Sequence, residues 1–355
     1  MKTYKIAVLP GDGIGPEIMK AAQTVLDAVS RKFNVEFNYT EADVGGVAIE
    51  KHGTALPKET VKICENSDAI LFGAVGDPRY DDLPPEKKIE PVALLGLRKH
   101  FDLFANLRPS FLYPFLYRTS PLKESIVKEG FDILIVRELT SDAYFGKKVL
   151  KEDMGSDEML YRKPEVERIA KTAFEAARKR KKYVTCVDKS NVLSSSILFR
   201  RTVTEVAKKY PDVKLDYLFI DNATTMIIKR PKDFDVMVTT NMFGDILSDE
   251  AAMLSGSLGM LPSASINEKG FGMYEPAGGS APKMAGKNTA NPIAQILSAA
   301  LMLRHSFKME KEAQAIESAV QKTLHKYRTK DIMEEGMEQV GTKEMGEKIA
   351  ENIGR

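Results

Sequence analysis

The 355-residue chain has few of the residues that build metal centres or disulfide frameworks. It contains two cysteines, Cys64 and Cys186, and four histidines, so neither a disulfide framework nor a cysteine-based zinc site can be assembled from them. The formal net charge is only +2, which excludes a bulk electrostatic field able to hold nucleic acid or an anionic membrane. We therefore expect a protein of the reducing cytoplasm, with neither nucleic acid nor a membrane as its partner.

Long hydrophobic runs are also absent. The first apolar stretch, residues 6–9, is too short for the core of a signal peptide, so we expect no export. The longest charge-free run, residues 288–303, falls short of the roughly 20 residues that span a bilayer and predicts a buried helix instead. Hydrophobic residues at 43% and charged residues at 29% are typical of folded globular proteins, and the length suggests about two domains.

Short β-rich runs alternate with amphipathic helical stretches, the pattern of an α/β fold with a partly parallel sheet. Helices are predicted after Pro16 and Pro164, and nearly continuous apolar runs predict buried strands at 69–72, 132–136 and 235–238. The basic run 178–182 ends the second of these helices, which favours a solvated helix end over a nucleic-acid site.

The glycine turn at residues 11–17 lies between the first strand and the first helix, where a dinucleotide fingerprint would stand. That fingerprint requires a third glycine at the position of Pro16, so the turn does not match it. Two interpretations of residues 11–17 remain: a loop that a ligand approaches closely, and a turn with a purely structural role.

Carboxylates and guanidinium groups form the strongest chemical pattern. Asp245 and Asp249 are four residues apart, so on a helix both project from one face and suit Mg²⁺ or Mn²⁺, with helix capping as the alternative. Asp221, at the end of another apolar run, is a third acid of this kind. Three arginines in apolar or turn-rich surroundings match carboxylate geometry, although each could equally form a structural ion pair: Arg98, Arg108 and Arg137.

Taken together, these segments resemble the β-decarboxylating dehydrogenase family nearly end to end. The motifs that carry the resemblance are residues 9–17, 103–109, 137–140, 144–146, 187–193, 241–250 and 256–265. The resemblance implies a two-lobed, non-Rossmann α/β fold with the active site in the cleft between the lobes. It places residues 1–103 and 256–355 in a cofactor-binding lobe. Residues 104–255 would form a central lobe with the dimer interface and an arm at about 147–162.

The same resemblance implies oxidative decarboxylation of (2R,3S)-3-isopropylmalate to 4-methyl-2-oxopentanoate in leucine biosynthesis, with NAD as cofactor. Tyr144 and Lys189 would be the catalytic acid–base pair, and Lys189 and Asp221 would enter the site from the neighbouring subunit of a homodimer. The remaining implied roles are substrate carboxylate binding by Arg98, Arg108, Arg137 and Asp221, an isopropyl pocket of Leu94, Leu95 and Val192, and a Mg²⁺ or Mn²⁺ site of Asp221, Asp245 and Asp249. The implied cofactor residues are Gly76, Glu90, Gly278, Gly279, Ser280, Ala281, Pro282, Lys283, Met284, Ala285, Gly286 and Asn291.

Several positions depart from the family pattern. Ser141-Asp142 stands where a Gly-Gly pair is expected, and Asp142 would lie either beside the site or toward solvent. Gly278 and Lys283 replace a histidine and an aspartate, and a cation at position 283 would accommodate the 2′-phosphate of NADP. Another 3-substituted malate, such as D-malate, tartrate or a longer alkylmalate, is the alternative substrate. A non-catalytic nucleotide-binding paralogue is the alternative of a different class.

Overall fold

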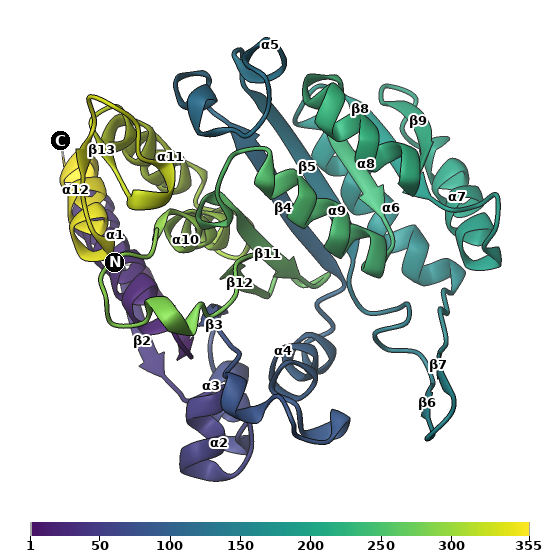
Figure 1. Cartoon of the computed structure of the whole chain (residues 1–355), viewed down its shortest axis with the longest axis horizontal. Helices are drawn as coiled ribbons and strands as arrows, with labels where there is room; N and C mark the ends of the chain where they lie inside the picture. The colour runs from purple at the N-terminus through teal and green to yellow at the C-terminus, as the bar shows by residue number, and fades with distance from the viewer. Residues whose placement is uncertain (1, 355) are drawn as a thin grey trace. The chain divides into compact units, whose positions relative to one another are not determined.

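The structure is a computed structural model that describes residues 2–354. The chain divides into two compact units, each built of strands and helices (Figure 1). Unit 1 contains the residues up to Leu103 and those from Ser257 onward, and unit 2 is Phe104–Gly256. Within residues 2–354, no helix combines the length and the apolar character that a bilayer crossing requires.

Unit 1 contributes five strands in the order β2-β1-β3-β12-β11. Strands β1, β2, β3 and β12 run parallel to one another, and β11 is antiparallel to β12. Their bounds are β1 Lys2–Gly11, β2 Val35–Glu41, β3 Ala69–Ala74, β11 Pro262–Ile266 and β12 Gly272–Pro276, and a short parallel pair is formed by β13 Tyr327–Arg328 and β14 Glu338–Gln339.

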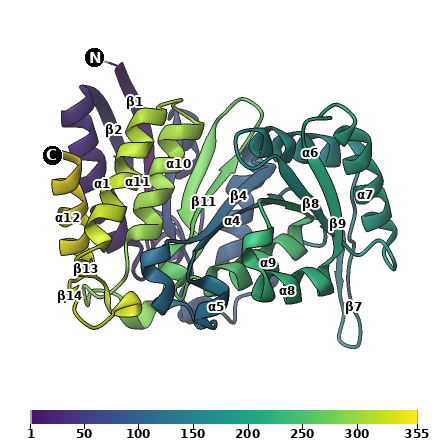
Figure 2. The ribbon, with the colours of Figure 1, turned by 90° about the horizontal axis from the view of Figure 1, so that it is seen from above.

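Helices cover both faces of these strands (Figures 1 and 2). On one face lie α1 Gly15–Phe33, α10 Ile293–His305, α11 Glu310–Leu324 and α12 Thr342–Gly354, and on the other lie α2 Gly46–His52, α3 Lys58–Glu65 and α4 Ile89–His100. Alternate strand residues such as Leu9 and Phe72 join Cys64 of α3 and Leu97 of α4 in one buried cluster. Because successive side chains of a strand point to opposite faces, each strand packs against the helices on both sides of the sheet.

The predicted buried helix at 288–303 is α10, which is buried almost throughout but begins five residues later than predicted. The side-chain oxygen of Asn291 accepts a hydrogen bond from the backbone N–H of Ile293 at 3.0 Å. This bond ends the preceding loop and satisfies one of the amides that a helix start leaves unpaired.

Unit 2 contributes five strands in the order β4-β5-β10-β8-β9. β4 is antiparallel to β5, and the other neighbours are parallel. The bounds are β4 Ala105–Leu112, β5 Phe131–Glu138, β8 Tyr183–Asp188, β9 Lys214–Phe219 and β10 Val236–Thr239. The register places Arg137, Thr239, Val187 and Leu218 side by side, so the carboxyl ends of the four parallel strands meet at one edge.

Two helix layers enclose this sheet (Figure 2). α6 Lys163–Arg178 and α7 Ser194–Ala207 form one layer, and α8 Ile220–Lys229 and α9 Asn241–Met253 form the other; α5 is the short helix Glu124–Val127. β6 Lys148–Leu150 and β7 Gly155–Asp157 pair as an exposed antiparallel hairpin within the segment predicted as an arm. Figure 1 shows this hairpin projecting beyond the other elements of unit 2.

The basic run 178–182 is only partly a solvated helix end. Arg178 pairs with Asp212 near the surface, but the Arg180 guanidinium turns inward and donates to the buried Asp235 carboxylate at 2.7 Å. The prediction was wrong for Arg180, because the buried carboxylate requires a partner.

Glu138, the last residue of β5, is fully buried and connects the sheet to the turn that follows. Its carboxyl oxygens accept from the Thr140 N–H at 3.0 Å, the Thr140 hydroxyl at 2.9 Å and the Ser141 N–H at 2.9 Å. Burial outweighs these bonds and raises the pKa of Glu138 from 4.5 to about 7. Between pH 4.5 and about 7, the Glu138 carboxyl is therefore protonated in the native protein but ionised in the unfolded protein.

This difference predicts a pH-dependent stability. The free energy of unfolding should fall as the pH rises from 4.5 to 7, because the native state binds more protons than the unfolded state in that window. The loss attributable to Glu138 should be on the order of 3 kcal/mol. Urea unfolding of the native protein and of Glu138→Gln at pH 5 and pH 7.5 isolates this contribution. Parallel pH dependences in the two proteins would contradict it.

Candidate active site

The sequence-predicted site residues of unit 2 gather at the edge where its parallel strands end. Arg137 is the second-to-last residue of β5, and Lys189 follows β8. Asp221 lies in the first turn of α8 after β9, and α9 with Asp245 follows β10. In open α/β sheets, ligands bind at the carboxyl ends of the strands because loops and helix starts converge there. The fold therefore explains why residues far apart in sequence lie at one edge.

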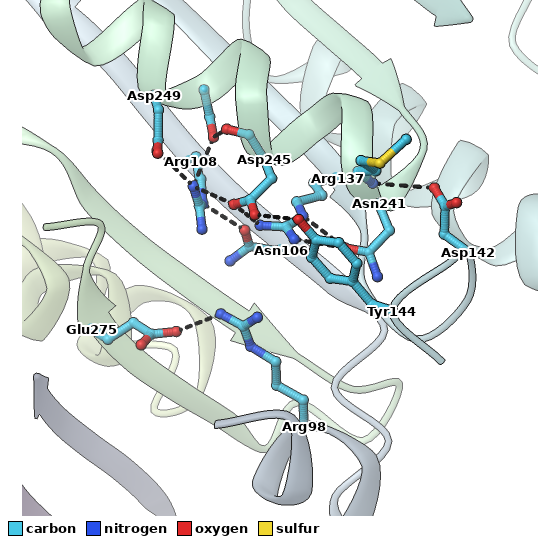
Figure 3. Close-up of polar contacts among 12 residues, drawn as sticks. Arg98, Asn106, Arg108, Arg137, Asp142, Tyr144, Asn241, Asp245, Asp249 and Glu275 are labelled. Atoms are coloured by element: carbon cyan, nitrogen blue, oxygen red, sulfur yellow. Dashed lines mark hydrogen bonds and ion pairs between the residues drawn. The ribbon is translucent and has the colours of Figure 1, made fainter. Parts of the chain in front are cut away.

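The two predicted site arginines of unit 2, Arg108 and Arg137, share one face of the antiparallel β4–β5 pair. Asn106 lies directly opposite Arg137, and Arg108 is two residues further along β4 on the same face. Arg108 donates to the Asn106 side-chain oxygen at 2.8 Å and to the Ser248 hydroxyl at 2.8 Å. Both guanidinium groups thus lie beneath α9, which packs on these strands (Figure 3).

Arg137 is 1% exposed and is bonded by two side chains of α9. Two of its nitrogens donate to the side-chain oxygen of Asn241, at 2.9 and 2.7 Å, and a third donates to Asp245 at 2.5 Å. A Cβ added to Gly244 would stand 2.6 Å from the Arg137 Cγ. Glycine at this position lets the helix approach the arginine closely enough for these bonds.

Asp245 is the meeting point of the cluster. Its carboxylate accepts from Arg137, lies 3.4 Å from the Arg108 Nη1, and accepts the Tyr144 hydroxyl at 2.8 Å (Figure 3). Asp249, one helical turn later, lies 3.2 Å from the same Arg108 nitrogen, so the predicted common face of the two acids is confirmed. Burial, followed by the charge of Asp245, raises the pKa of Tyr144 to about 12, so this phenol is protonated at neutral pH.

The predicted metal ligands fall into two places. Among the described residues, no three histidine, cysteine or acidic side chains are arranged to hold a metal ion together. Asp245 and Asp249 present neighbouring carboxylates, the hard oxygen donors that Mg²⁺ and Mn²⁺ prefer, and therefore fit two positions of such a site. Asp221 instead pairs with Lys189 at 2.7 Å, and this hydrogen bond is the main cause that lowers the pKa of Asp221.

In unit 1, Arg98 is buried in the last turn of α4. It donates to the Glu275 carboxylate at 3.0 Å, and its Nε has no partner among the described residues (Figure 3). Of the predicted isopropyl contacts, Leu94 and Leu95 are half-buried on α4, whereas Val192 belongs to unit 2 and is 68% exposed.

The glycine turn at 11–17 braces two loops that contain predicted cofactor residues. The Asp12 carboxylate accepts from the amides of Gly46 at 2.8 Å, Val47 at 3.0 Å and Gly76 at 2.9 Å. The Ile14 N–H donates to the Ser280 carbonyl at 2.8 Å, and the Ser280 hydroxyl donates to the Gly76 carbonyl at 2.6 Å. The turn therefore has a structural role, and it holds Gly76 and Ser280 together.

The remaining predicted cofactor residues lie largely at the surface. Gly279, Pro282, Lys283, Met284 and Gly286 are exposed, and Gly278, Ala281 and Ala285 are half-buried. A Cβ added at Gly279 would meet no described atom within 4 Å, so the space beside this α-carbon is open. Asn291 is bonded to Asp331 at 3.0 Å, and Glu90 is exposed in the first turn of α4.

Sequence reasoning missed the side chains that hold the predicted residues in place. Asn106, Asn241, Ser248 and Glu275 each bond one of the three arginines. The Asn241 position, directly before a predicted acidic helix, carries a signal. The alternative in which Asp142 faces solvent was wrong, because this residue is buried and bonded to the start of α9.

Comparisons with known proteins show the family of this chain. The family model for isocitrate/isopropylmalate dehydrogenase matches residues 5–349. A 3-isopropylmalate dehydrogenase of Pectobacterium atrosepticum is 58% identical, with 98% of each chain covered, and one of Mannheimia succiniciproducens is 56% identical, covering 99% of this chain and all of the relative.

Solved structures extend the match to the fold. The isocitrate dehydrogenase of Methylococcus capsulatus aligns with a TM-score of 0.87 at 33% identity, covering 99% of this chain and 100% of the other. A β-decarboxylating dehydrogenase of Thermococcus kodakarensis aligns with a TM-score of 0.79 at 35% identity over 99% and 96%. The predicted α/β fold and the predicted resemblance are therefore confirmed. The chain belongs to the isocitrate/isopropylmalate dehydrogenase family.

Proposed function

We propose that the chain is an oxidoreductase that converts (2R,3S)-3-isopropylmalate to 4-methyl-2-oxopentanoate in leucine biosynthesis. Relatives named 3-isopropylmalate dehydrogenase align over nearly the whole chain at 58% and 56% identity. The structural observation that carries the proposal is the cluster in which Arg108, Arg137 and Tyr144 all contact Asp245. It combines carboxylate-binding groups with a protonated acid, as decarboxylation of a malate requires.

The arginines supply substrate binding in this proposal. Arg108 and Arg137 would bind substrate carboxylate oxygens, and Arg98 has an unpartnered buried Nε available for the same purpose. Leu94, Leu95 and Val192 would contact the isopropyl group, which favours this substrate over isocitrate with its third carboxylate.

Tyr144 and Lys189 would move the protons. Lys189 would belong to the base network that takes the proton of the C2 hydroxyl as hydride leaves for nicotinamide. Tyr144, which keeps its proton at neutral pH, would then protonate the carbon that has lost CO₂. A divalent ion held by Asp245, Asp249 and Asp221 would supply Lewis-acid polarisation of the oxygens at C1 and C2.

We also propose a homodimer in which Lys189 and Asp221 reach the site of the neighbouring subunit. Exposed apolar side chains support this assembly: Leu150 and Met154 on the hairpin, and Ile228, Ile246 and Met253 on α8 and α9. Both cysteines are free and buried, which supports action in the cytoplasm, where thiols stay reduced.

The primary test measures reduced-nicotinamide absorbance with 3-isopropylmalate, D-malate and isocitrate, each with NAD and NADP in Mg²⁺. We expect turnover of 3-isopropylmalate to be faster than turnover of the other two acids. Faster turnover of D-malate or isocitrate would show that 3-isopropylmalate is not the preferred substrate. No turnover of any of the three acids, with nucleotide binding retained, would favour a non-catalytic paralogue.

In Tyr144→Phe, loss of the proton donor should lower kcat about 10²- to 10⁴-fold with little change in KM. Tyr39→Phe, which removes a hydroxyl bonded to Asp27, is the matched control with unchanged kcat.

Cofactor preference forms a second prediction. The exposed Lys283 cation would pair with the 2′-phosphate of NADP, so the native protein should use NADP in addition to NAD. Lys283→Asp should lower kcat/KM for NADP by at least about tenfold while NAD turnover is kept, because a carboxylate repels the phosphate. Lys287→Asp, an equal change of charge nearby, is the control. The same NAD/NADP ratio in the native protein and in both variants would contradict a role for Lys283.

Subunit complementation tests the shared sites. Lys189→Met and Asp245→Asn should each be inactive as homodimers. If Lys189 serves the neighbouring site, mixed dimers formed by co-expression contain one intact site and regain activity. If both residues serve their own chain, every site in the mixed dimer lacks one of them and activity stays absent. A monomer in sedimentation experiments would also contradict this part of the proposal.

A further inference from the structure

Asp142 occupies a backbone conformation that favours glycine. Its φ is +73°, in the left-handed region that side chains rarely adopt, although aspartate tolerates it better than most because its carboxylate can bond locally. Here the carboxylate accepts from the next amide, that of Ala143, at 2.7 Å. This is one of the positions where the sequence departs from its family pattern, so the side chain replaces the hydrogen atom of a glycine.

The side chain closes the start of α9. It is 1% exposed, and its second oxygen accepts from the Tyr161 hydroxyl at 3.0 Å and from the Met242 N–H at 3.1 Å. The Asn241 N–H donates to the same Tyr161 oxygen at 2.7 Å. Thr240, the residue in the N-cap position, makes no side-chain capping bond. Asp142 and Tyr161 therefore satisfy the first two amides of this helix, where a negative charge is also favourable.

The same turn holds the candidate proton donor. The carbonyl of Asp142 accepts from the amides of Phe145 at 3.1 Å and Gly146 at 2.9 Å, which enclose Tyr144 in one tight turn. The Asn241 amide group donates to the Ser141 carbonyl at 3.0 Å. Asp142 thus joins the segment that presents Tyr144 to the helix that presents Asp245 (Figure 3).

We propose that Asp142 is a positioning residue, which sets the Tyr144 hydroxyl against the start of α9 so that the proton is delivered to the reacting carbon. Its carboxylate bonds the helix start, Tyr161 and its own turn, so it acts through Tyr144 and Asp245. This role rests on the proposed function. It differs from a specificity role, because the carboxylate is engaged by α9 and is not presented to the substrate.

The test compares Asp142→Asn, Asp142→Gly and Tyr161→Phe with the native protein. Displacing the Tyr144 hydroxyl should slow proton transfer more than it weakens substrate binding. Each variant should therefore lower kcat for 3-isopropylmalate about tenfold while KM stays within about twofold. Asp142→Asn combined with Tyr161→Phe should lose less than the product of the two single losses, because both residues serve one helix start.

Asp235→Asn is the matched control. Asp235 is also 1% exposed in unit 2 and accepts from Arg180 and from the Lys181 amide, but it contacts none of the proposed site residues in the bonds described. This variant should lower the thermal unfolding midpoint and leave kcat unchanged. The Asp142 variants should lower kcat even when each protein is assayed at the same number of degrees below its own unfolding midpoint.

Native kcat in Asp142→Asn, or an equal kcat loss in Asp235→Asn, would overturn the positioning role. A changed preference among malates with kcat retained would also overturn it and assign specificity instead. If Asp142→Asn does not fold, Tyr161→Phe carries the same expectation. Silence of the native protein on every malate would instead overturn the proposed function.

Discussion

The buried guanidinium of Arg137 is the charge on which the arrangement of unit 2 depends. A cation removed from water is tolerated only when its donors are bonded, and here the oxygens of Asn241 and Asp245 fulfil that requirement. Both acceptors belong to α9, so the helix must lie against the end of β5. Gly244 makes that approach possible, and the position of Tyr144 follows from its bond to Asp245.

The four charged side chains of the cluster carry no net charge together. Two guanidinium groups, of Arg108 and Arg137, face two carboxylates, of Asp245 and Asp249. A malate dianion and a divalent cation entering together would add no net charge, whereas either one alone would disturb the balance.

Much of the fold could be predicted because burial leaves periodic patterns in the sequence. The strands near 70, 134 and 237 and the helices after Pro16 and Pro164 all follow such patterns. The charged residues of the site could be named because arginine and aspartate in apolar surroundings need partners. Their partners could not be named, because Ser248 becomes a neighbour of Arg108 only through the packing of α9 on the strands, and Asn106 becomes one only because both lie on one face of β4. The inward turn of Arg180 was set by a tertiary bond as well, whereas the start of α10 was set by the local bond from the Ile293 N–H to Asn291.

The bonds of Asp12 and Ile14 hold the loops around Gly76 and Ser280 through backbone groups, which affects how the sequence of these loops can evolve. The loop at 278–286 is held by backbone groups and by Ser280, while the side chains at 283 and 284 extend from it without supporting it. Substitutions at these two positions therefore carry little penalty in folding. Natural variation can explore new nucleotide preferences there, one residue at a time, on a scaffold that remains intact.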